Sequence, residues 1–553
     1  MVNNDKYVLG EGKYAVVLNS RKTTKVCKKI TYGQSGEGMS KSFVVETSIL
    51  RLLANTNHIV HCSGVSIKND EYCLYLERYE RELRYLRCVS EAQAKIIIFK
   101  LLIALNDSHE KGIIHSDISP TNILVNGSVD VAICDWGISK IALCENTLFS
   151  NCVQARWWRA PEILLGEDRY TNKIDIWSCG IIMLQLVTHI EYLKGRSADE
   201  QLHLIFKTFG TPDETTWPNV SKLRKWPKFL SSDDTTKHVP ISFNILVPPG
   251  TSSGYITLML KMLTLCPKDR ISAREALMDP YFSEFPKPEL VPDMNDYLQS
   301  RQIDCSYPEY VSKICVETLV QLILTTGMKF GLSFDTYFLS VSLLGIFLQK
   351  IKTLPEKDFY LYGIVSLMLS YDIHDKFSVS SHELSQACLH LYSAARIVRA
   401  EINVFKTLDF DIIRPTEYTF LQMLCLAFDD YTIKMNAAIL LVVGTSSYDL
   451  RKYESFDLAL SALFIVLSIY SESCDLFLEK IKTQYAEKLK NEKIYSIMEQ
   501  LIVVFNKSCD KNDNPVLYKI QNSANAISGN LDRFVHILND GISSVRTQLA
   551  TIK

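Results

Sequence analysis

The sequence predicts an α+β domain followed by an all-α domain. Residues 7 to 30 hold short β-branched runs around glycines, the pattern of a hairpin-rich sheet, and helical periodicity takes over from about Ala92. The stretch from Asp279 to Pro292 contains four prolines, which helix interiors exclude, so a linker is expected there. From residue 308 to about 507 the chain shows only apolar helical patterns separated by short polar breaks.

The bulk composition fits an ordinary globular protein. Of 553 residues, 47% are hydrophobic and 22% are charged, and the formal net charge is −2, so neither disorder nor a nucleic-acid partner is indicated. The 15 cysteines form no Cys-x-x-Cys pair, which favours a reducing compartment. The first ten residues contain no basic region followed by an apolar run, so we expect no secretory signal, and the most apolar run, after Asp457, is too short to span a bilayer. We expect an intracellular protein of the cytoplasm, the nucleus or both, without a membrane partner.

Two glycines and an ion pair suggest a phosphate site in the first domain. Gly10-Glu11-Gly12 leads into a strand that contains Val17, and such glycines let backbone N–H groups approach phosphates. Taken alone, this pattern is more typical of a plain hairpin turn. Lys28 lies on the next apolar strand and Glu46 on a helix eighteen residues later, so Glu46 can orient Lys28 toward phosphates. Each residue by itself could equally be a solvated surface charge.

The segment from Ile114 to Leu124 is more specific. It offers Asp117 to accept a hydroxyl proton and Asn122, five residues later, to hold a metal. Asp135-Trp136-Gly137 follows, and its carboxylate should bind Mg²⁺ against the ATP phosphates. Further along, Glu162 in Ala-Pro-Glu can form a buried ion pair with Arg270.

With these motifs in order, residues 7 to 285 resemble the protein kinases, and within them the cyclin-dependent kinases. The closest stretches are FKTFGTPDETTWPNV (206 to 220) and WWRAPEILLG (157 to 166). The resemblance implies a bilobal serine/threonine kinase domain over 1–285, with lobes 1–79 and 80–285, that uses ATP and Mg²⁺ on protein substrates. It also implies a set of nucleotide-binding residues: Gly10, Glu11, Gly12, Val17, Lys28, Leu76 as gatekeeper, and the backbones of Glu77 and Tyr79.

Several positions depart from that family. Ser116, Val45 and Lys140 stand where the family has three arginines that clamp an activation-loop phosphate, so phosphorylation of Ser150 is not expected to be required for activity. Ser119 replaces a lysine that stabilises the transferring phosphoryl group, and Ala155 replaces the threonine that contacts both this lysine and the catalytic aspartate, here Asp117, so both contacts are expected to be lost. A weakly active kinase or a pseudokinase scaffold whose helical half binds protein partners is therefore the alternative.

Substrate preference is only partly indicated. Arg159 and Val153 match the family's proline-directed pocket, whereas Gln154 and Arg156 do not, so the resemblance supports a Ser/Thr-Pro preference only in part.

The helical half resembles a cyclin. An apolar helix over 330–350, a second over 361–373, and a third holding Glu401 and ending in Leu-x-Phe-Asp suggest two five-helix repeats over 308–507, after a linker of 286–307 and before a tail of 508–553. Glu401 matches the cyclin glutamate that helps bind the kinase, but Asp372 stands where cyclins have a lysine. We expect this domain to activate the kinase in cis. It could also bind other protein partners. If the helical half were unrelated to cyclins, it would not contact the Glu46 helix.

Overall fold

The computed structural model describes most of the chain, in these ranges: 6–11, 15–20, 24–30, 38–68, 71–143, 154–226, 237–286, 294–302, 306–375, 377–427, 430–469 and 471–508. The chain divides into two compact units. The first holds residues up to Tyr32 and from Ser40 to Tyr297, and the second holds Gly33–Met39 and everything from Leu298 onward.

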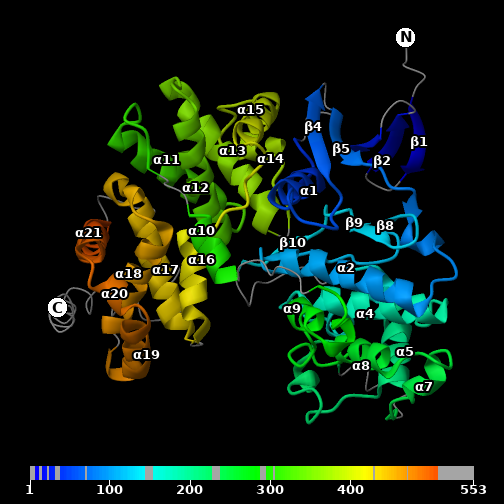
Figure 1. The fold of residues 1–553 in the computed structure, drawn as a ribbon. Helices are drawn as coiled ribbons and strands as arrows, with labels where there is room; N and C mark the ends of the chain where they lie inside the picture. The colour runs from blue at the N-terminus through cyan, green and yellow to red at the C-terminus, as the bar shows by residue number, and fades with distance from the viewer. Residues whose placement is uncertain are drawn as a thin grey trace. The chain divides into compact units, whose positions relative to one another are not determined.

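The first unit begins with a five-stranded antiparallel sheet in the order β1-β2-β3-β5-β4 (Figure 1). Its strands are β1 Lys6–Glu11, β2 Ala15–Ser20, β3 Lys25–Ile30, β4 Cys62–Lys68 and β5 Glu71–Glu77. Helix α1 (Lys41–Leu52) enters between β3 and β4, and Ser40 caps its first turn by accepting a hydrogen bond from the backbone N–H of Phe43 at 3.3 Å. Phe43 packs against Tyr72 of β5 with ring centroids 5.2 Å apart, which fixes α1 on the sheet.

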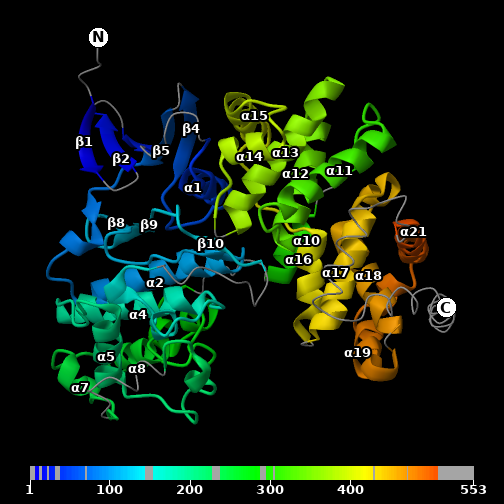
Figure 2. The ribbon, with the colours of Figure 1, turned by 180° about the vertical axis from the view of Figure 1, so that it is seen from behind.

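The rest of this unit is mainly helical. Helix α2 (Glu91–His109) lies against α4 (Lys173–Thr188), which is buried along nearly its whole length (Figure 2). The remaining elements are β6 Arg81–Glu82, η1 Leu83–Tyr85, β7 Ile113–Ile114, β8 Ile123–Asn126, β9 Asp130–Ile133, β10 Lys140–Ile141, η2 Arg156–Trp158, α3 Pro161–Leu164, α5 Ala198–Phe209, η3 Val220–Lys222, α7 Phe243–Leu246, α8 Ser253–Met262, α9 Ala273–Leu277 and η4 Pro280–Phe282. A helix as apolar as α4 needs cover on all sides, so it forms the core around which the unit packs.

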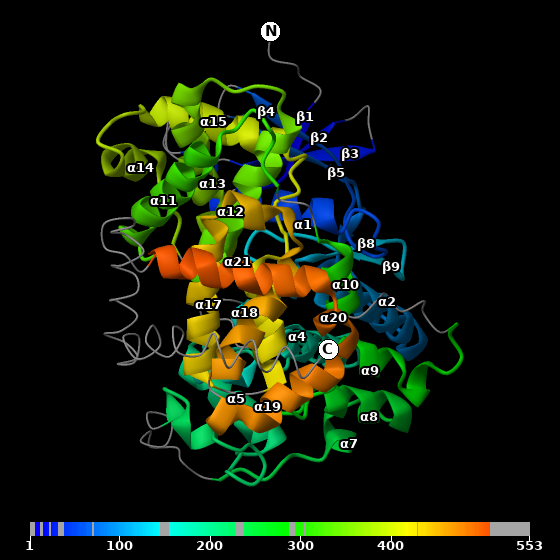
Figure 3. The same ribbon diagram turned by 90° about the vertical axis from the view of Figure 1, so that its left-hand side faces the viewer.

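The second unit is all-α in its described part, apart from short 3₁₀ turns. Its first group of helices is α11 Lys313–Met328, α12 Phe334–Lys350, α13 Glu356–His374, α14 Ser381–Ala387 and α15 Ala394–Thr407. Its second group is α16 Glu417–Leu424, η5 Cys425–Ala427, α17 Tyr431–Thr445, η6 Tyr448–Lys452, α18 Ser455–Ile469, α19 Ser471–Gln484, α20 Ala486–Leu489 and α21 Glu492–Ser508. Helix α21 crosses α17 and α18, and Figure 3 shows it running over both.

The predicted fold class is confirmed: a sheet-rich lobe and a helical lobe are followed by an all-α domain. One boundary needs correction, because helix α10 (Met294–Ser300) lies inside the range predicted as a linker, 286–307. The prolines behind that prediction end at Pro292 and so precede the helix. Leu298 is buried in the second unit, which therefore starts earlier than the sequence suggested. No helix in the described ranges combines the length and apolar character needed to cross a membrane.

Candidate active site

Strand β3 and helix α1 bring a lysine and two carboxylates together. Nζ of Lys28 lies 2.8 Å from Glu46, which is fully buried, and 2.7 Å from Oδ1 of Asp135, which is half exposed. Burial alone would lower the pKa of Lys28, but the two carboxylates outweigh it and raise the pKa. Burial likewise opposes ionisation of Asp135, yet the charge of Lys28 holds the pKa of this carboxyl below its usual value. Lys28 is thus a cation fixed between two carboxylates.

Asp117 is held at both carboxylate oxygens. Asn122 donates from Nδ2 to Oδ2 at 2.8 Å and to the Asp117 carbonyl at 2.9 Å, and the backbone N–H of Ala155 donates to Oδ1 at 2.7 Å. Partial burial raises the pKa of Asp117, and the charge of Asp135 adds to the rise, while His115 and the two N–H donors oppose it. Two N–H donors therefore orient the carboxylate.

A buried carboxylate supports the loop that carries Asp117. Asp175 of α4 accepts from the backbone N–H groups of His115 at 2.8 Å and Ser116 at 3.0 Å, and its Oδ2 lies 3.0 Å from Nε2 of His109. Ser116 has φ +67°, a left-handed conformation that non-glycine residues adopt only when their surroundings enforce it. The hydrogen bonds from the His115 and Ser116 N–H groups to Asp175 hold Ser116 in this conformation.

The sheet places the predicted nucleotide-binding residues on one face. Val17 pairs with Lys28 and Val26 with Leu76, and because residues two apart on β3 share a face, Val17, Lys28 and Leu76 line the same side. Glu77 pairs with Lys25 at the end of β5, and Tyr79, two residues further on, is half-buried, with burial and Glu77 raising its pKa to about 12. Gly10 and Glu11 lie on β1 opposite Val17 and Val16, whereas Gly12 lies outside the described residues.

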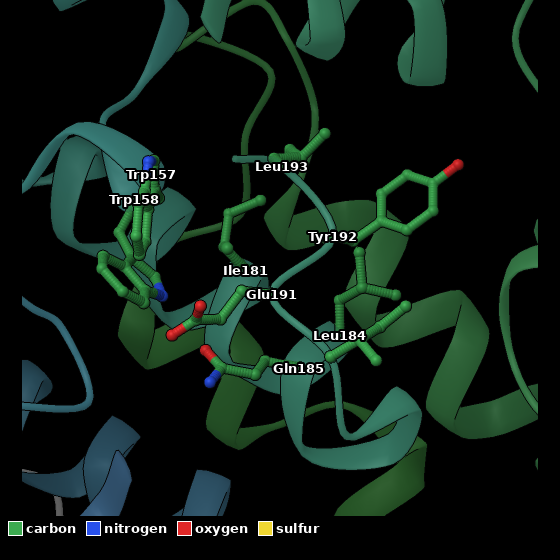
Figure 4. Close-up of a pocket in the computed structure, with 9 residues that line it drawn as sticks. Trp157, Trp158, Ile181, Leu184, Gln185, Glu191, Tyr192 and Leu193 are labelled. Carbon is green, nitrogen blue, oxygen red and sulfur yellow. The ribbon is translucent and has the colours of Figure 1, made fainter. Parts of the chain in front are cut away.

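The segment that begins at Gln154 is anchored on α4 through the Gln154 side chain. Gln154 adopts a left-handed conformation (φ +66°), and Arg159 donates to its carbonyl oxygen from Nη2 at 2.7 Å. Beyond it, Trp157 and Trp158 line one wall of a small pocket opposite Leu184 and Tyr192 (Figure 4). Val153 and the predicted phosphorylation site Ser150 lie outside the described residues.

Two other predicted features can be assessed. Arg270, buried, binds both carboxylate oxygens of Glu162 at 2.7 and 2.9 Å, so the predicted buried ion pair is confirmed. Of the three clamp positions only Lys140 carries a cation, but Lys41 lies close by. Burial, together with the charge of Lys41, lowers the pKa of Lys140 to about 8.

The donor set suits a hard divalent cation. Both hydrogen bonds of the Asn122 amide use Nδ2, which leaves its carbonyl oxygen for a metal, and Asp135 presents a half-exposed carboxylate. Mg²⁺ typically takes one or two such oxygens and completes its shell with water and phosphate. The residues therefore fit Mg²⁺ bound together with a nucleotide.

The loop immediately before α1 belongs to the second unit. The backbone N–H of Met39 donates to Oε2 of Glu401 at 3.1 Å, and Glu401 is fully buried. A Cβ added to Gly38 (φ +105°) would lie 2.7 Å from Met368 Cε and 3.0 Å from the Glu401 carboxylate, so only glycine fits. Burial, with the nearby Asp372, raises the pKa of Glu401 well above its usual range.

Sequence reasoning missed two elements of this site. It predicted that the loss of a threonine at position 155 would cost a contact to Asp117, whereas the backbone N–H of Ala155 makes one. It also gave the Gln154 side chain no role, because the α4 residues to which its amide nitrogen donates, Ile174 and Ser178, lie 20 and 24 residues away and no local pattern marks them.

Comparison with known proteins gives a consistent result. A model of the protein kinase domain matches residues 4–282, and a model of the cyclin N-terminal domain matches 292–413. Cyclin-dependent kinase B2-2 of Arabidopsis thaliana is 32% identical over 296 residues, which cover 50% of this chain and 92% of that protein. A probable cyclin-dependent serine/threonine-protein kinase of Dictyostelium discoideum is 31% identical over 316 residues, or 56% of this chain and 22% of that protein.

Among solved structures, the CAK complex of Chaetomium thermophilum bound to ATP-γ-S matches with 32% sequence identity and a TM-score of 0.46. The match covers 51% of this chain and 92% of the matched chain.

Proposed function

Because this chain belongs to the protein kinase family, as a cyclin-dependent-type serine/threonine kinase that also carries a cyclin-like domain, we propose that it phosphorylates protein serine and threonine hydroxyls with ATP and is activated in cis by that domain. The observation that carries the catalytic part is the convergence of Lys28, Glu46 and Asp135 beside Asp117 and Asn122.

Each of these side chains has a role that its surroundings allow. Lys28 holds ATP phosphates, and Glu46 keeps Lys28 in place. Asp117 accepts a hydrogen bond from the substrate hydroxyl, aligns it for attack and takes its proton. Asn122 and Asp135 would hold Mg²⁺, which, when bound, neutralises charge on the phosphates. The bond between the terminal phosphorus of ATP and the oxygen of the leaving ADP breaks as the new bond from this phosphorus to the substrate hydroxyl oxygen forms.

The cis activation rests on the loop before α1. Met39 is bonded to Glu401 within the second unit, and Ser40, the next residue, caps the helix that carries Glu46. The helical domain thus holds the chain at Met39, two residues before α1 begins at Lys41. A covalent tether raises the effective concentration of such a domain to about millimolar, which would make a separate cyclin unnecessary.

The substrate loop favours proline after the phosphorylated residue. The carbonyl oxygen of Gln154 is occupied by Arg159, so a substrate N–H at the next position would find no acceptor there. Leaving an N–H unpaired costs about 1–3 kcal/mol, and proline has no N–H to lose. We therefore propose Ser-Pro and Thr-Pro sequences as the substrate class.

Phosphate transfer to a Ser-Pro peptide by the full chain tests the catalytic proposal. Asp117→Asn should lower kcat by roughly 10²–10⁴-fold, the range for loss of a general base. The second candidate, a scaffold with little activity, is favoured by Ser119, which is buried and bonds Thr121 at 2.8 Å in place of a cation. Incorporation no greater than that of Asp117→Asn would establish the scaffold.

The cis proposal has its own test. Residues 1–290 alone should be much less active than the full chain, and residues 291–553 added in trans should restore activity only at high concentration. Within the full chain, Glu401→Leu removes the acceptor for Met39 and should lower activity, whereas Glu401→Gln keeps an acceptor oxygen and should not. Full activity of residues 1–290 would refute activation in cis.

A further inference from the structure

The side chain of Gln154 is fully used inside the first unit. It is buried, with 5% of its surface exposed. Its Nε2 donates to the carbonyl of Ile174 at 2.9 Å and to Oγ of Ser178 at 2.8 Å, and its Oε1 accepts from the backbone N–H of Ala160 at 3.0 Å. An amide with both donor hydrogens and its oxygen satisfied is locked in one orientation. Two of these partners lie on α4, which is buried along nearly its whole length.

The backbone of Gln154 is fixed as firmly. Its N–H donates to the carbonyl of Ser116 at 2.8 Å, and its own carbonyl accepts from Arg159. Its φ of +66° lies in the left-handed region, which a residue with a Cβ rarely adopts. Such a conformation persists only where the surroundings over-determine it, and here two backbone and three side-chain bonds do so.

The residue that follows shows what this fixation achieves. The N–H of Ala155 donates to Oδ1 of Asp117 at 2.7 Å. A methyl side chain offers no donor of its own, so this contact depends entirely on how the peptide between Gln154 and Ala155 is oriented. That orientation is set by the conformation of Gln154.

We infer that Gln154 is a positioning residue for the catalytic base, because its buried amide sets the backbone from which Ala155 holds Asp117. This inference rests on the proposed kinase activity. In this arrangement the backbone N–H of Ala155 donates to Asp117, in place of the side-chain hydroxyl of the threonine that the resembled family has at position 155. The side-chain amide of Gln154 plays no part in binding ATP, since its hydrogen-bond partners all lie in the helical lobe of the first unit.

A second buried glutamine provides a matched control. Gln201 of α5 is fully buried and ties the same region together by accepting from the N–H of Gly195 at 2.9 Å and donating to the carbonyl of Trp157 at 3.3 Å. Neither bond touches a residue that contacts Asp117. Loss of the Gln201 amide therefore reports what general loosening of this region does to activity.

The test compares Gln154→Met with Gln201→Met in the full chain. Methionine keeps nearly the same volume but removes every amide hydrogen bond. We expect Gln154→Met to lower kcat by about 10- to 100-fold, the scale expected when a reacting group is misplaced, with KM for ATP changed less than about twofold. Gln201→Met should lower kcat less than about threefold. Equal losses in the two variants would overturn the inference.

A double-mutant cycle separates positioning from structural damage. In an Asp117→Ala background, measured by single turnover, adding Gln154→Met should change the residual rate less than about twofold, because its effect acts through Asp117. A full additional loss there would show that Gln154 is merely structural. If Gln154→Met does not fold, Ser178→Ala, which removes one amide acceptor, is placed in the same cycle with the same criteria.

Failure of the inference is distinct from failure of the proposed function. An inactive wild-type chain would overturn both. An active wild-type chain with an unaffected Gln154→Met variant would overturn only the role of Gln154.

Discussion

Nζ of Lys28 lies 2.8 Å from each carboxylate oxygen of Glu46. Because Glu46 is fully buried, this pair fixes the position of the Lys28 ammonium group, to which we assign the ATP phosphates. The neighbouring residue on the same strand, Lys29, forms an exposed pair with Glu71 at 2.6 Å. One strand thus carries a buried pair in the cleft and an exposed pair on the opposite face.

Glu46→Gln should therefore lower kcat/KM by about 10²–10³-fold, the range for loss of one preorganised electrostatic group. Glu71→Gln is the matched control and should change it less than about twofold, since exposed ion pairs contribute little. Steady-state peptide phosphorylation measures both. Similar effects of the two substitutions would contradict a special role for Glu46.

Restoring the missing cation should speed catalysis. Ser119 and Ala155 stand where the resembled family has lysine and threonine, and the structure has a hydroxyl pair, Ser119 with Thr121, in their place. Ser119→Lys combined with Ala155→Thr should raise kcat at least about fivefold by adding charge stabilisation in the transition state. Single-turnover rates at saturating ATP measure the gain. A lower rate with unchanged thermal stability would show that this site works by another arrangement.

Much of the cleft could be predicted because its residues lie in short motifs. Asp117 and Asn122 are five residues apart and bond directly, so their spacing carried the prediction. The contact from Ala155 to Asp117 could not be predicted, because every residue has a backbone N–H and nothing in the sequence shows which ones are aimed at a carboxylate. The bond between Met39 and Glu401 joins residues 362 apart, and only folding reveals it.

Arg159 should control the preference for proline. Arg159→Met frees the Gln154 carbonyl to accept an N–H from the substrate, so Ser-Ala peptides should gain relative to Ser-Pro peptides. A wild-type preference of roughly 5- to 150-fold in kcat/KM, equivalent to about 1–3 kcal/mol, should shrink toward unity. Arg156→Met is the control, because Arg156 donates to the Arg196 carbonyl instead. An unchanged ratio in Arg159→Met would contradict the proposed substrate class.

The buried Arg270–Glu162 ion pair should contribute strongly to the unfolding free energy of the helical lobe of the first unit. Arg270 also donates to the carbonyls of Thr264, Lys173 and Leu265, and both charged partners are buried. Arg270→Met leaves the Glu162 carboxylate buried without its cation, which should cost about 3–5 kcal/mol of unfolding free energy. Chemical denaturation measures it, and the double variant Arg270→Met/Glu162→Met should recover part of the loss. For comparison, Arg196→Met, which breaks an exposed pair, should cost less than about 1 kcal/mol.

The contribution of Asp335 to the stability of the second unit should fall between about pH 4 and pH 6 as the pH rises. Burial, with Asp375 adding and Lys434 opposing, raises the pKa of Asp335 on α12 from 3.8 to about 6. In that interval the folded state binds more protons than the unfolded state, so the free energy of unfolding falls until Asp335 is ionised in both. Asp335→Asn removes this penalty and should raise Tm by up to roughly 5 °C at pH 7.5 but not at pH 4. Calorimetry at both pH values measures the difference. Asp449→Asn is the control, because Lys313 lowers the pKa of this exposed carboxyl and its loss should not stabilise the fold at pH 7.5.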